Sequence, residues 1–362
     1  MMKRLGDYIR PVDVRNRDLR VTKLVGLTID KAFIPSVANT IGTDLSNYKV
    51  ISENQFACSL MQVSRDGKMP IAMFKGEPCI MSPAYPMFEV SNTSDLLPEY
   101  LMMWFSRSEF DREASFYAVG GVRGSLEWND FCDMRLPIPS IEKQREIVAE
   151  YNTLATRIET NKKLIATLEQ TAQALFQKLT LEHSRSCLFS DIATIVMGQS
   201  PEGDFVNRQG EGEPLLNGPT EFGLFSPTPV QWTITPKKLC KEGDVLFCVR
   251  GSTTGRMNFA NQIYAIGRGL AAIRAKNDYY DWSVKIVLEQ YMQEILASAT
   301  GSTFPNVSSD MISNLGIVVP NESSMEKYSF EGRNLINLIG LKSKENQTLV
   351  QMQTLLFSKM GA

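Results

Sequence analysis

The stretch LPIPSIEKQREIV, residues 136–148, places two prolines around one isoleucine and then changes at once to a charged sequence that favours a helix. Proline has no backbone N–H and fixes its own φ, so Pro137 and Pro139 predict the end of one element and a short extended segment. Ser140 is suited to cap a following helix, and Glu142 lies in its first turn, where a negative charge is favourable. The stretch therefore predicts a boundary between a folded module and a helix.

After this boundary, apolar residues recur in steps of three and four as far as Leu179. This 3.5-residue repeat lasts for about five heptads and is flanked by Glu, Lys, Arg and Gln, as in a coiled coil. A helix of roughly 40 residues would be about 60 Å long. A core helix of a bundle would carry the same pattern, but globular helices usually have about 8 to 20 residues, which favours an exposed two-helix strut.

The second half of the chain repeats the first with a shift of 181 residues. The shift places ALFQKL (174–179) on LLFSKM (355–360) and LPIPS (136–140) on IVVPN (317–321). Two copies predict the order module, helix, module, helix. The expected boundaries are 1–140 for the first module, 141–182 for the first helix, 183–321 for the second module and 322–362 for the second helix.

The two long helices are predicted to pack against each other through their apolar positions. These positions are Ile147, Tyr151, Leu154, Ile158, Asn161, Ile165, Leu168 and Leu175 in the first helix, and Leu335, Ile339, Leu349 and Leu356 in the second. The second helix also has Gly332, Gly340, Lys342, Asn346 and Gln353 on or near this seam. They predict a less straight helix, and a polar layer that faces Asn161 and fixes the register.

Composition agrees with two globular modules. The chain has 362 residues, of which 43% are hydrophobic and 22% charged, so there is room for two cores of about 140 residues. No apolar run approaches the roughly 18 residues of a membrane span, and the first residues lack the apolar stretch of a signal peptide. These two features predict no membrane partner. The six cysteines form no CxxC pair, which predicts buried thiols in a reducing cytoplasm.

Each module is expected to mix strands with helices, which makes the fold class α+β. Strands are predicted within residues 22–29, 48–51, 55–63, 69–74 and 87–90 of the first copy, and within 230–235, 244–249, 256–260 and 270–275 of the second. An amphipathic helix is expected to follow in each copy, over 98–117 and over 283–299. Glycine-rich turns between the strands are where binding residues usually lie.

Motifs for catalysis are missing from the sequence. The only histidine, His183, lies in a polar linker, which leaves no histidine cluster for a metal and no serine–histidine pair. No phosphate-binding GxxxxGK[ST] loop is present, and VGGVRG (119–124) lacks the first glycine of a dinucleotide-binding fingerprint. The stretch SPAYP (82–86) matches the NPPY-type loop of adenine methyltransferases only in outline. A binding protein without a metal or cofactor of its own is favoured.

The net charge of −2 gives no general attraction to nucleic acid. Locally, however, positive residues lie in or beside glycine turns, where a guanidinium can reach a base edge or a phosphate. Lys68 of the first copy and Arg256 of the second align. A solvated surface charge explains any single one of these residues about as well as a DNA contact does. The candidate DNA-binding residues are Arg65, Lys68, Arg123, Arg250, Arg256, Asn258, Arg268 and Thr303.

Two variable modules, each closed by a segment such as LPIPSIEKQREIV or GIVVPNESSMEKY and a long helix, resemble the specificity subunit of a type I restriction-modification system. The strand and loop sequences CIMSPAYPMFEV (79–90) and GDVLFCVRGSTTGR (243–256) are similar to target-recognition modules of that family. The resemblance covers essentially the whole chain. It implies two target-recognition modules that read the two halves of a split DNA site, and an antiparallel coiled coil that fixes their separation.

The resemblance also implies partner subunits. Two modification subunits would carry S-adenosylmethionine and methylate adenine, and restriction subunits would carry ATP with Mg²⁺ for translocation and cleavage. This chain would itself be non-catalytic. Two other functions remain open from the sequence: a two-module DNA-binding or scaffold protein outside restriction systems, and a cryptic nuclease or methyltransferase.

Overall fold

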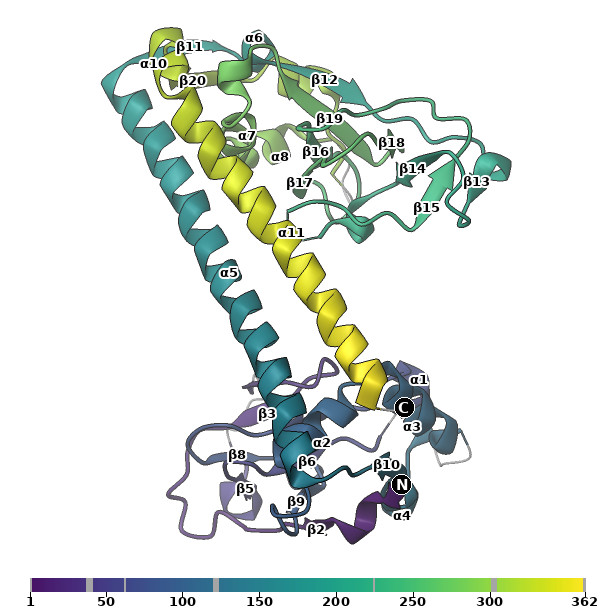
Figure 1. Ribbon diagram of the computed structural model, residues 1–362. Helices are drawn as coiled ribbons and strands as arrows, with labels where there is room; N and C mark the ends of the chain where they lie inside the picture. The colour runs from purple at the N-terminus through teal and green to yellow at the C-terminus, as the bar shows by residue number, and fades with distance from the viewer. Residues whose placement is uncertain are drawn as a thin grey trace. The chain divides into compact units, whose positions relative to one another are not determined.

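The computed structural model describes residues 2–36, 42–61, 63–119, 124–223, 225–300 and 305–360 (Figure 1). The chain forms two compact units, Met1–Thr156 with Leu349–Ala362, and Arg157–Thr348. Two long helices, α5 (Ile141–Glu182) and α11 (Ser329–Met360), contribute to both units. The four-part division at residues 140, 182 and 321 remains a prediction.

The duplication is visible in the sheets, whose strands follow the same order in the two units. The first unit has the sheet β2 (Ile9–Pro11), β9 (Met87–Val90), β6 (Phe56–Cys58), β7 (Ile71–Met73). The second has β12 (Ala193–Met197), β19 (Leu270–Ala275), β16 (Val245–Cys248), β17 (Met257–Phe259). All neighbours in both sheets are antiparallel. The expected α+β fold with an internal duplication is confirmed.

The proline-containing segments before the two helical regions are both short strands at the end of a globular module. Their extended backbone agrees with the φ that proline fixes. In the first unit β10 (Arg135–Pro137) pairs with β1 (Met2–Arg4). In the second, β20 (Gly316–Pro320) pairs with β11 (Ser184–Leu188). Ser140 then accepts a hydrogen bond on Oγ from the Lys143 N–H at 3.4 Å, at the start of α5.

Smaller elements complete each unit. The first unit also contains β3 (Val25–Leu27), β4 (Phe33–Pro35), β5 (Lys49–Ile51), β8 (Cys79–Met81), α1 (Val63–Asp66), α2 (Pro98–Phe105), α3 (Ser108–Ala118) and α4 (Trp128–Asp133). The second also contains β13 (Val206–Asn207), β14 (Glu213–Leu216), β15 (Gln231–Thr233), β18 (Ala265–Ile266), α6 (Phe189–Ile192), α7 (Val284–Gln290), α8 (Met292–Ser298), α9 (Ser309–Ser313) and α10 (Glu322–Lys327).

Each unit has its own aromatic core. In the first, the rings of Phe56 and Phe88 stack with centroids 5.0 Å apart on the inner face of the sheet. In the second, Phe176 of α5 meets the ring of Trp282 edge-on at 6.0 Å. The long helices are therefore part of the two cores as well as a connection between modules.

The single helices predicted over 98–117 and 283–299 are wrong, because each is interrupted. Arg107 adopts an extended backbone (φ −76°, ψ 143°) between α2 and α3, and its guanidinium lies 4.2 Å from the Trp104 ring centroid. Tyr291 separates α7 from α8, and its hydroxyl accepts a hydrogen bond from the Val318 N–H at 2.8 Å. Both interruptions occur at a residue whose side chain makes a specific contact, which helical periodicity alone does not report.

The polar layer predicted at Asn161 is present in the second unit. Asn161 Nδ2 donates to Asn346 Oδ1 at 3.0 Å, and both side chains are buried. Beside them, Glu345 pairs with Arg157 at 2.6 Å and with Lys342 at 2.7 Å. Hydrogen bonds from Arg157 and Lys342 lower the pKa of Glu345 to about 2. A buried amide pair of this kind favours one register of a helix pair over others.

The other seam residues are shielded from solvent to different degrees. In the first unit Leu356 is buried, and Tyr151 stacks on Phe357 with centroids 5.4 Å apart. In the second unit Ile158, Ile165 and Ile339 are buried. The half-buried members are Ile147, Tyr151, Leu154 and Leu349 in the first unit and Leu168, Leu175 and Leu335 in the second.

The glycines of the second long helix do not interrupt it, because α11 is one continuous element from Ser329 to Met360. They make room for aromatic rings instead. A Cβ on Gly332 would lie 2.2 Å from Trp282 Cδ2, and one on Gly340 would lie 3.1 Å from Phe225 Cε1. The sequence predicted a less straight helix at these glycines. In the structure the glycines let the helix backbone approach the second core.

The cysteines agree with the expectation of free thiols. All six are unpaired, and all but Cys187 are buried. Burial raises the pKa of Cys240 and that of Cys248 to about 12, so these thiols resist ionisation. Within the part of the chain that the structure describes, no helix combines the length and the apolar character needed to cross a membrane.

Candidate nucleic-acid interface

Three arginines gather at one end of the sheet of the second unit. Arg250 and Arg256 lie in the connection from β16 to β17, and Arg268 lies in the turn from β18 to β19. The register places the ends of these strands together, because Cys248 pairs with Leu270 and Phe247 with Met257. A backbone hydrogen bond of 2.9 Å from the Val249 N–H to the Gly269 carbonyl joins the two turns.

The β16–β17 connection is a tightly bonded turn. Gly255 has a φ of +90°, a backbone conformation that favours glycine. Thr254 Oγ1 donates to the carbonyls of Gly251 at 2.8 Å and Pro305 at 3.0 Å. These contacts fix the backbone that carries Arg250 and Arg256, as a recognition surface needs.

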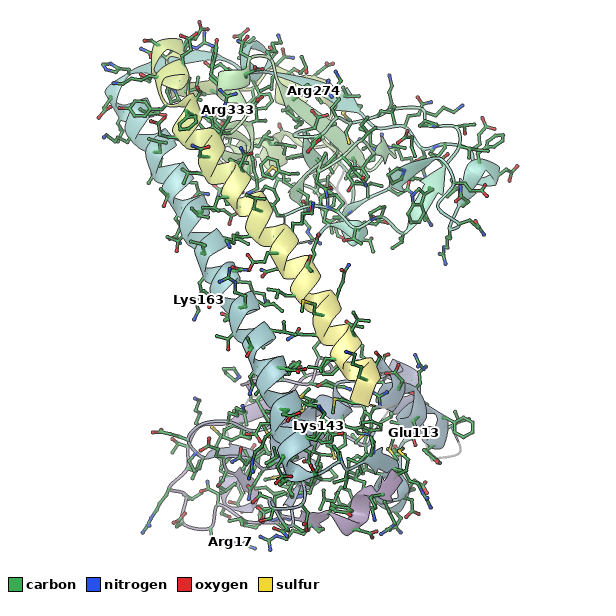
Figure 2. All side chains as sticks on the ribbon, in the orientation of Figure 1. Arg17, Glu113, Lys143, Lys163, Arg274 and Arg333 are labelled. Atoms are coloured by element: carbon green, nitrogen blue, oxygen red, sulfur yellow. The ribbon has the colours of Figure 1, made fainter. Side chains whose placement is uncertain are left out.

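The three guanidinium groups are available for a ligand. Arg250, Arg256 and Arg268 are exposed, and none has a side-chain hydrogen bond or salt bridge to any residue that the structure describes. Arg274 (Figure 2), at the other end of β19, differs because it makes two 2.7 Å hydrogen bonds to the buried carboxylate of Asp244. Arg274 therefore has a structural partner, whereas the three turn arginines can meet phosphates or base edges.

The first unit presents positive charge at the corresponding place. Arg65 of α1 and Lys68, which follows the left-handed Gly67, both lie in the connection from β6 to β7. Each has an acidic neighbour: Arg65 contacts Asp66 at 2.7 Å and Lys68 contacts Asp30 at 3.4 Å. The hydrogen bond from Arg65 lowers the pKa of Asp66. Exposed ion pairs of this kind contribute little stability and can be exchanged for contacts with a ligand.

Asn258, a further candidate from the sequence, does not present its side chain at these turns. Asn258 is 2% exposed, donates to the Gly223 carbonyl at 3.0 Å and accepts from the Phe259 N–H at 2.8 Å, so its side chain supports the turn from within. Arg123 and Thr303 lie outside the described residues. In the N-terminal basic stretch, Arg4 and Arg10 are held in local ion pairs with Asp133 and Glu89.

Gln199 was not among the residues predicted from the sequence. The sheet brings it to the end where Arg250, Arg256 and Arg268 lie. Its N–H donates to the Ile266 carbonyl at 2.9 Å, and its side chain is exposed just after β12. The adjacent Ser200 Oγ accepts from the Arg268 N–H at 3.2 Å. A glutamine amide can form a bidentate pair with adenine in the major groove. The only signal in the sequence is the glycine at 198, which ends a strand before a polar loop.

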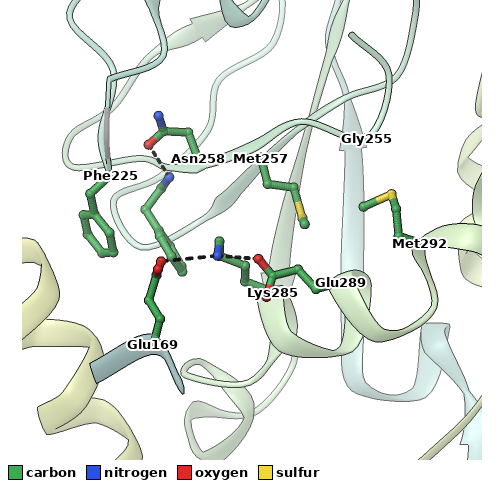
Figure 3. Close-up of a pocket in the computed structure, with 9 residues that line it drawn as sticks. Glu169, Phe225, Gly255, Met257, Asn258, Lys285, Glu289 and Met292 are labelled. Atoms are coloured by element: carbon green, nitrogen blue, oxygen red, sulfur yellow. Dashed lines mark hydrogen bonds and ion pairs between the residues drawn. The ribbon is translucent and has the colours of Figure 1, made fainter. Parts of the chain in front are cut away.

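Behind the β16–β17 turn is an open cavity of about 370 Å³ (Figure 3). On one side Lys285 extends between Glu169 at 3.7 Å and Glu289 at 2.5 Å. On the other, the Phe225 and Phe259 rings stack at 4.8 Å. The described lining holds no thiol, hydroxyl or histidine beside a base, and no group of metal-binding side chains occurs among the described residues. The lysine charge is already neutralised by two carboxylates, so this arrangement supports packing.

Comparison with known proteins points to one family. No protein-family model matches the chain. A curated type I restriction enzyme specificity subunit of Methanocaldococcus jannaschii is 24% identical over an aligned length of 354 residues, and the alignment covers 91% of this chain and 82% of the relative. This similarity confirms the resemblance seen in the helix starts and the duplicated layout.

One solved structure supports the fold. The type I restriction-modification S subunit from M. genitalium superposes with a TM-score of 0.63 at 11% identity, over 100% of this chain and 96% of the other. The specificity subunit from Thermoanaerobacter tengcongensis is 22% identical over 100% of this chain and 96% of the other, with a TM-score of 0.39. At this level of identity the first of these comparisons shows that the α+β fold with two long helices is shared.

Proposed function

We propose that this chain is the DNA-recognition subunit of a type I restriction-modification complex and reads an asymmetric site made of two half-sites and a spacer. The observation that carries the proposal is the repeated sheet, which presents a different set of side chains at the same connection in each unit. The second unit offers Arg250 and Arg256 there, and the first offers Arg65 and Lys68. Equal scaffolds with unequal turns are suited to two unequal half-sites.

The long helices would set the spacing of the half-sites. Forty-two residues of α5 correspond to about 63 Å at 1.5 Å per residue. The buried pair of Asn161 and Asn346 holds one register of the helices. A fixed register makes helix length a fixed quantity, which can be converted into a number of base pairs.

The reaction itself would belong to partner subunits in the cytoplasm. Two modification subunits would supply S-adenosylmethionine and methylate adenine, and restriction subunits would supply ATP-driven translocation and cleavage. With a net charge of −2, the isolated chain has only its local arginines to attract DNA. Stable specific binding is therefore expected in the assembled complex.

The function is tested by reconstitution. The purified chain, the modification subunit, S-adenosylmethionine and genomic DNA fragments should together give methyl transfer, and leaving out the chain should abolish it. The chain alone should bind DNA weakly and transfer no methyl group. Binding of S-adenosylmethionine by the isolated chain would contradict this role and favour the cryptic methyltransferase. Specific DNA binding without any dependence on a modification subunit would favour a DNA-binding protein outside restriction systems.

Substitution of single turn residues should show which unit recognises which half-site. We expect Arg256→Ala to weaken recognition of one half-site and Lys68→Ala to weaken the other, each by roughly 1 to 3 kcal/mol if the side chain contacts a base. The measurement is the binding of the reconstituted complex to DNA with either half-site altered, over a range of salt concentrations. Arg274→Ala is not a suitable control because Arg274 holds the buried Asp244.

The salt dependence assigns the contact. A loss on all sequences with a shallower slope of log K against log salt would show that the residue contacts phosphate. An unchanged affinity for every DNA would show that Arg256 and Lys68 are solvated surface charges that do not contact DNA.

A further inference from the structure

The first unit exposes a cluster of apolar side chains at the C-terminal end of α3, called the aromatic tip below. It consists of Phe116, Tyr117 and Val119, which are 75%, 45% and 74% exposed. The two rings meet edge-on with centroids 5.8 Å apart. The opposite face of α3 supplies Phe110, Ala114 and Ala118 to the core. The module therefore buries one side of this helix and leaves three large apolar side chains in water.

The segments around the aromatic tip are those that carry the positive charges of the first unit. Figure 1 shows α1 beside α3, and the two helices are in contact. The Met69 N–H donates to Asp111 Oδ1 of α3 at 3.1 Å, which ties the residue after Lys68 to this helix. Ser64 Oγ, next to Arg65, donates to the Gly124 carbonyl at 3.4 Å. An apolar cluster and two basic side chains thus belong to one locally connected surface.

At the aligned place, the described residues of the second unit form no such cluster. The shift of 181 residues that aligns the two copies places Ala297, Ser298 and Thr300 at the positions of Phe116, Tyr117 and Val119. A surface that docks the same partner on both modules would be expected in both copies. A surface that reads DNA must differ between the copies if the two half-sites differ. The restriction of the aromatic tip to one copy therefore favours DNA over a protein partner.

We propose that the aromatic tip contacts the bases of the half-site that the first unit reads, beside the DNA contacts of Arg65 and Lys68. Apolar side chains make such contacts with thymine methyl groups or by wedging between base steps. Exposed apolar clusters rimmed by polar residues commonly mark interaction sites. This inference rests on the proposed function and adds a specificity-determining surface that the aligned residues Ala297, Ser298 and Thr300 of the second unit do not provide.

The test uses the complete chain assembled with its modification subunit. The double variant Phe116→Ala, Tyr117→Ala should bind DNA carrying its bipartite site roughly tenfold more weakly or worse, which corresponds to about 1.4 kcal/mol. The loss should disappear when the first half-site is scrambled, because the contact is then already absent. The slope of log K against log salt should not change, since no charge has been removed. The half-site concerned is the one that Arg256→Ala leaves unaffected.

Two further variants make the result specific. Phe116→Trp keeps a flat apolar ring and should retain most of the binding. Ile234→Ala removes a 57% exposed apolar side chain directly after β15 in the second unit and should not affect recognition of the first half-site. Because the tip residues lie outside the core, the melting temperature of each variant should stay near that of the original chain.

Three results would overturn the inference. Unchanged binding and methylation by the double variant, when the original complex reads its site, would remove the aromatic tip from DNA recognition and leave the proposed function intact. Failure of the double variant to assemble with the modification subunit would make the tip a protein-docking surface. If the original complex has no bipartite site that depends on this chain, the proposed function fails first, and the inference with it.

Discussion

Deletion of one heptad from each long helix is expected to abolish methylation at the original site and to create a site with a shorter spacer. Removal of residues 161–167 from α5 and of 342–348 from α11 shortens each helix by about 10 Å. DNA rises about 3.4 Å per base pair, so the spacer should lose up to roughly three base pairs. Both half-site sequences should stay the same, and methylome sequencing of cells that carry the variant reads both quantities.

Removal from both helices is needed because the deletions take out Asn161 and Asn346 together. Neither buried amide is then left without its partner, which would cost about 1 to 3 kcal/mol, and the 3.5-residue seam stays in phase. Lys163→Ala, on the exposed side of α5, is the control for sequence change without length change and should keep the spacing. Methylation of the same half-sites at the original spacing by the double deletion would show that the helices do not set the distance.

The second large effect is expected from Gly332→Ala. Alanine normally stabilises a helix interior by about 1 kcal/mol relative to glycine. Here the new Cβ would lie 2.2, 2.4 and 2.5 Å from three ring atoms of Trp282. That ring is 1% exposed and cannot move into solvent. We expect the second unit to lose about 3 kcal/mol or more, at the upper end of overpacking in a core, measured as the free energy of unfolding in denaturant.

Gly340→Ala provides a graded control. Its Cβ would approach one edge of the Phe225 ring at 3.1 Å, a contact that a small shift can relieve. The loss of stability should therefore be smaller than for Gly332→Ala. Stabilisation by both alanines would contradict the close packing of α11 against the second core.

Local rules were sufficient for the long helices and for the duplication. The heptad repeat that begins at Ile147 needs no distant contact to be recognised, and Pro137 and Pro139 place its start within a few residues. The break at Tyr291 was not predictable in this way, since its hydroxyl acts through a tertiary contact with Val318. The break at Arg107 coincides with a stacking contact on the nearby Trp104 ring, which the spacing of apolar residues does not report. The three-residue strands β2, β4 and β8 are too short for an alternating pattern to be distinguished from a loop.

In the candidate site too, local features were predictable from the sequence, whereas features that depend on distant contacts were not. The alignment of Lys68 with Arg256 placed both residues in equivalent strand connections, because glycine turns and strand patterns are local features. The hydrogen bond of Asn258 joins it to the carbonyl of Gly223, 35 residues away, and no local rule shows that such a side chain faces inward. Gln199 was missed for the converse reason, since only the pairing of β12 with β19 brings it to the arginines.

The role of glycine in α11 depends on distant residues in a similar manner. Gly332 has a low helix propensity, and the sequence therefore indicated a weak point. The structure puts Trp282 against it, so the same residue is required for packing. For Gly332→Ala, helix propensity predicts a gain in the free energy of unfolding, whereas the contact with Trp282 predicts a loss. The measured sign therefore distinguishes the two effects.

Methylome sequencing of the host, with this gene intact and with it deleted, shows whether the chain selects the methylated site. We expect one asymmetric bipartite motif, with methylated adenine in both half-sites, that is present with the gene and absent without it. Persistence of every methylated motif in the deletion strain would contradict the assignment of this chain as the subunit that selects the site.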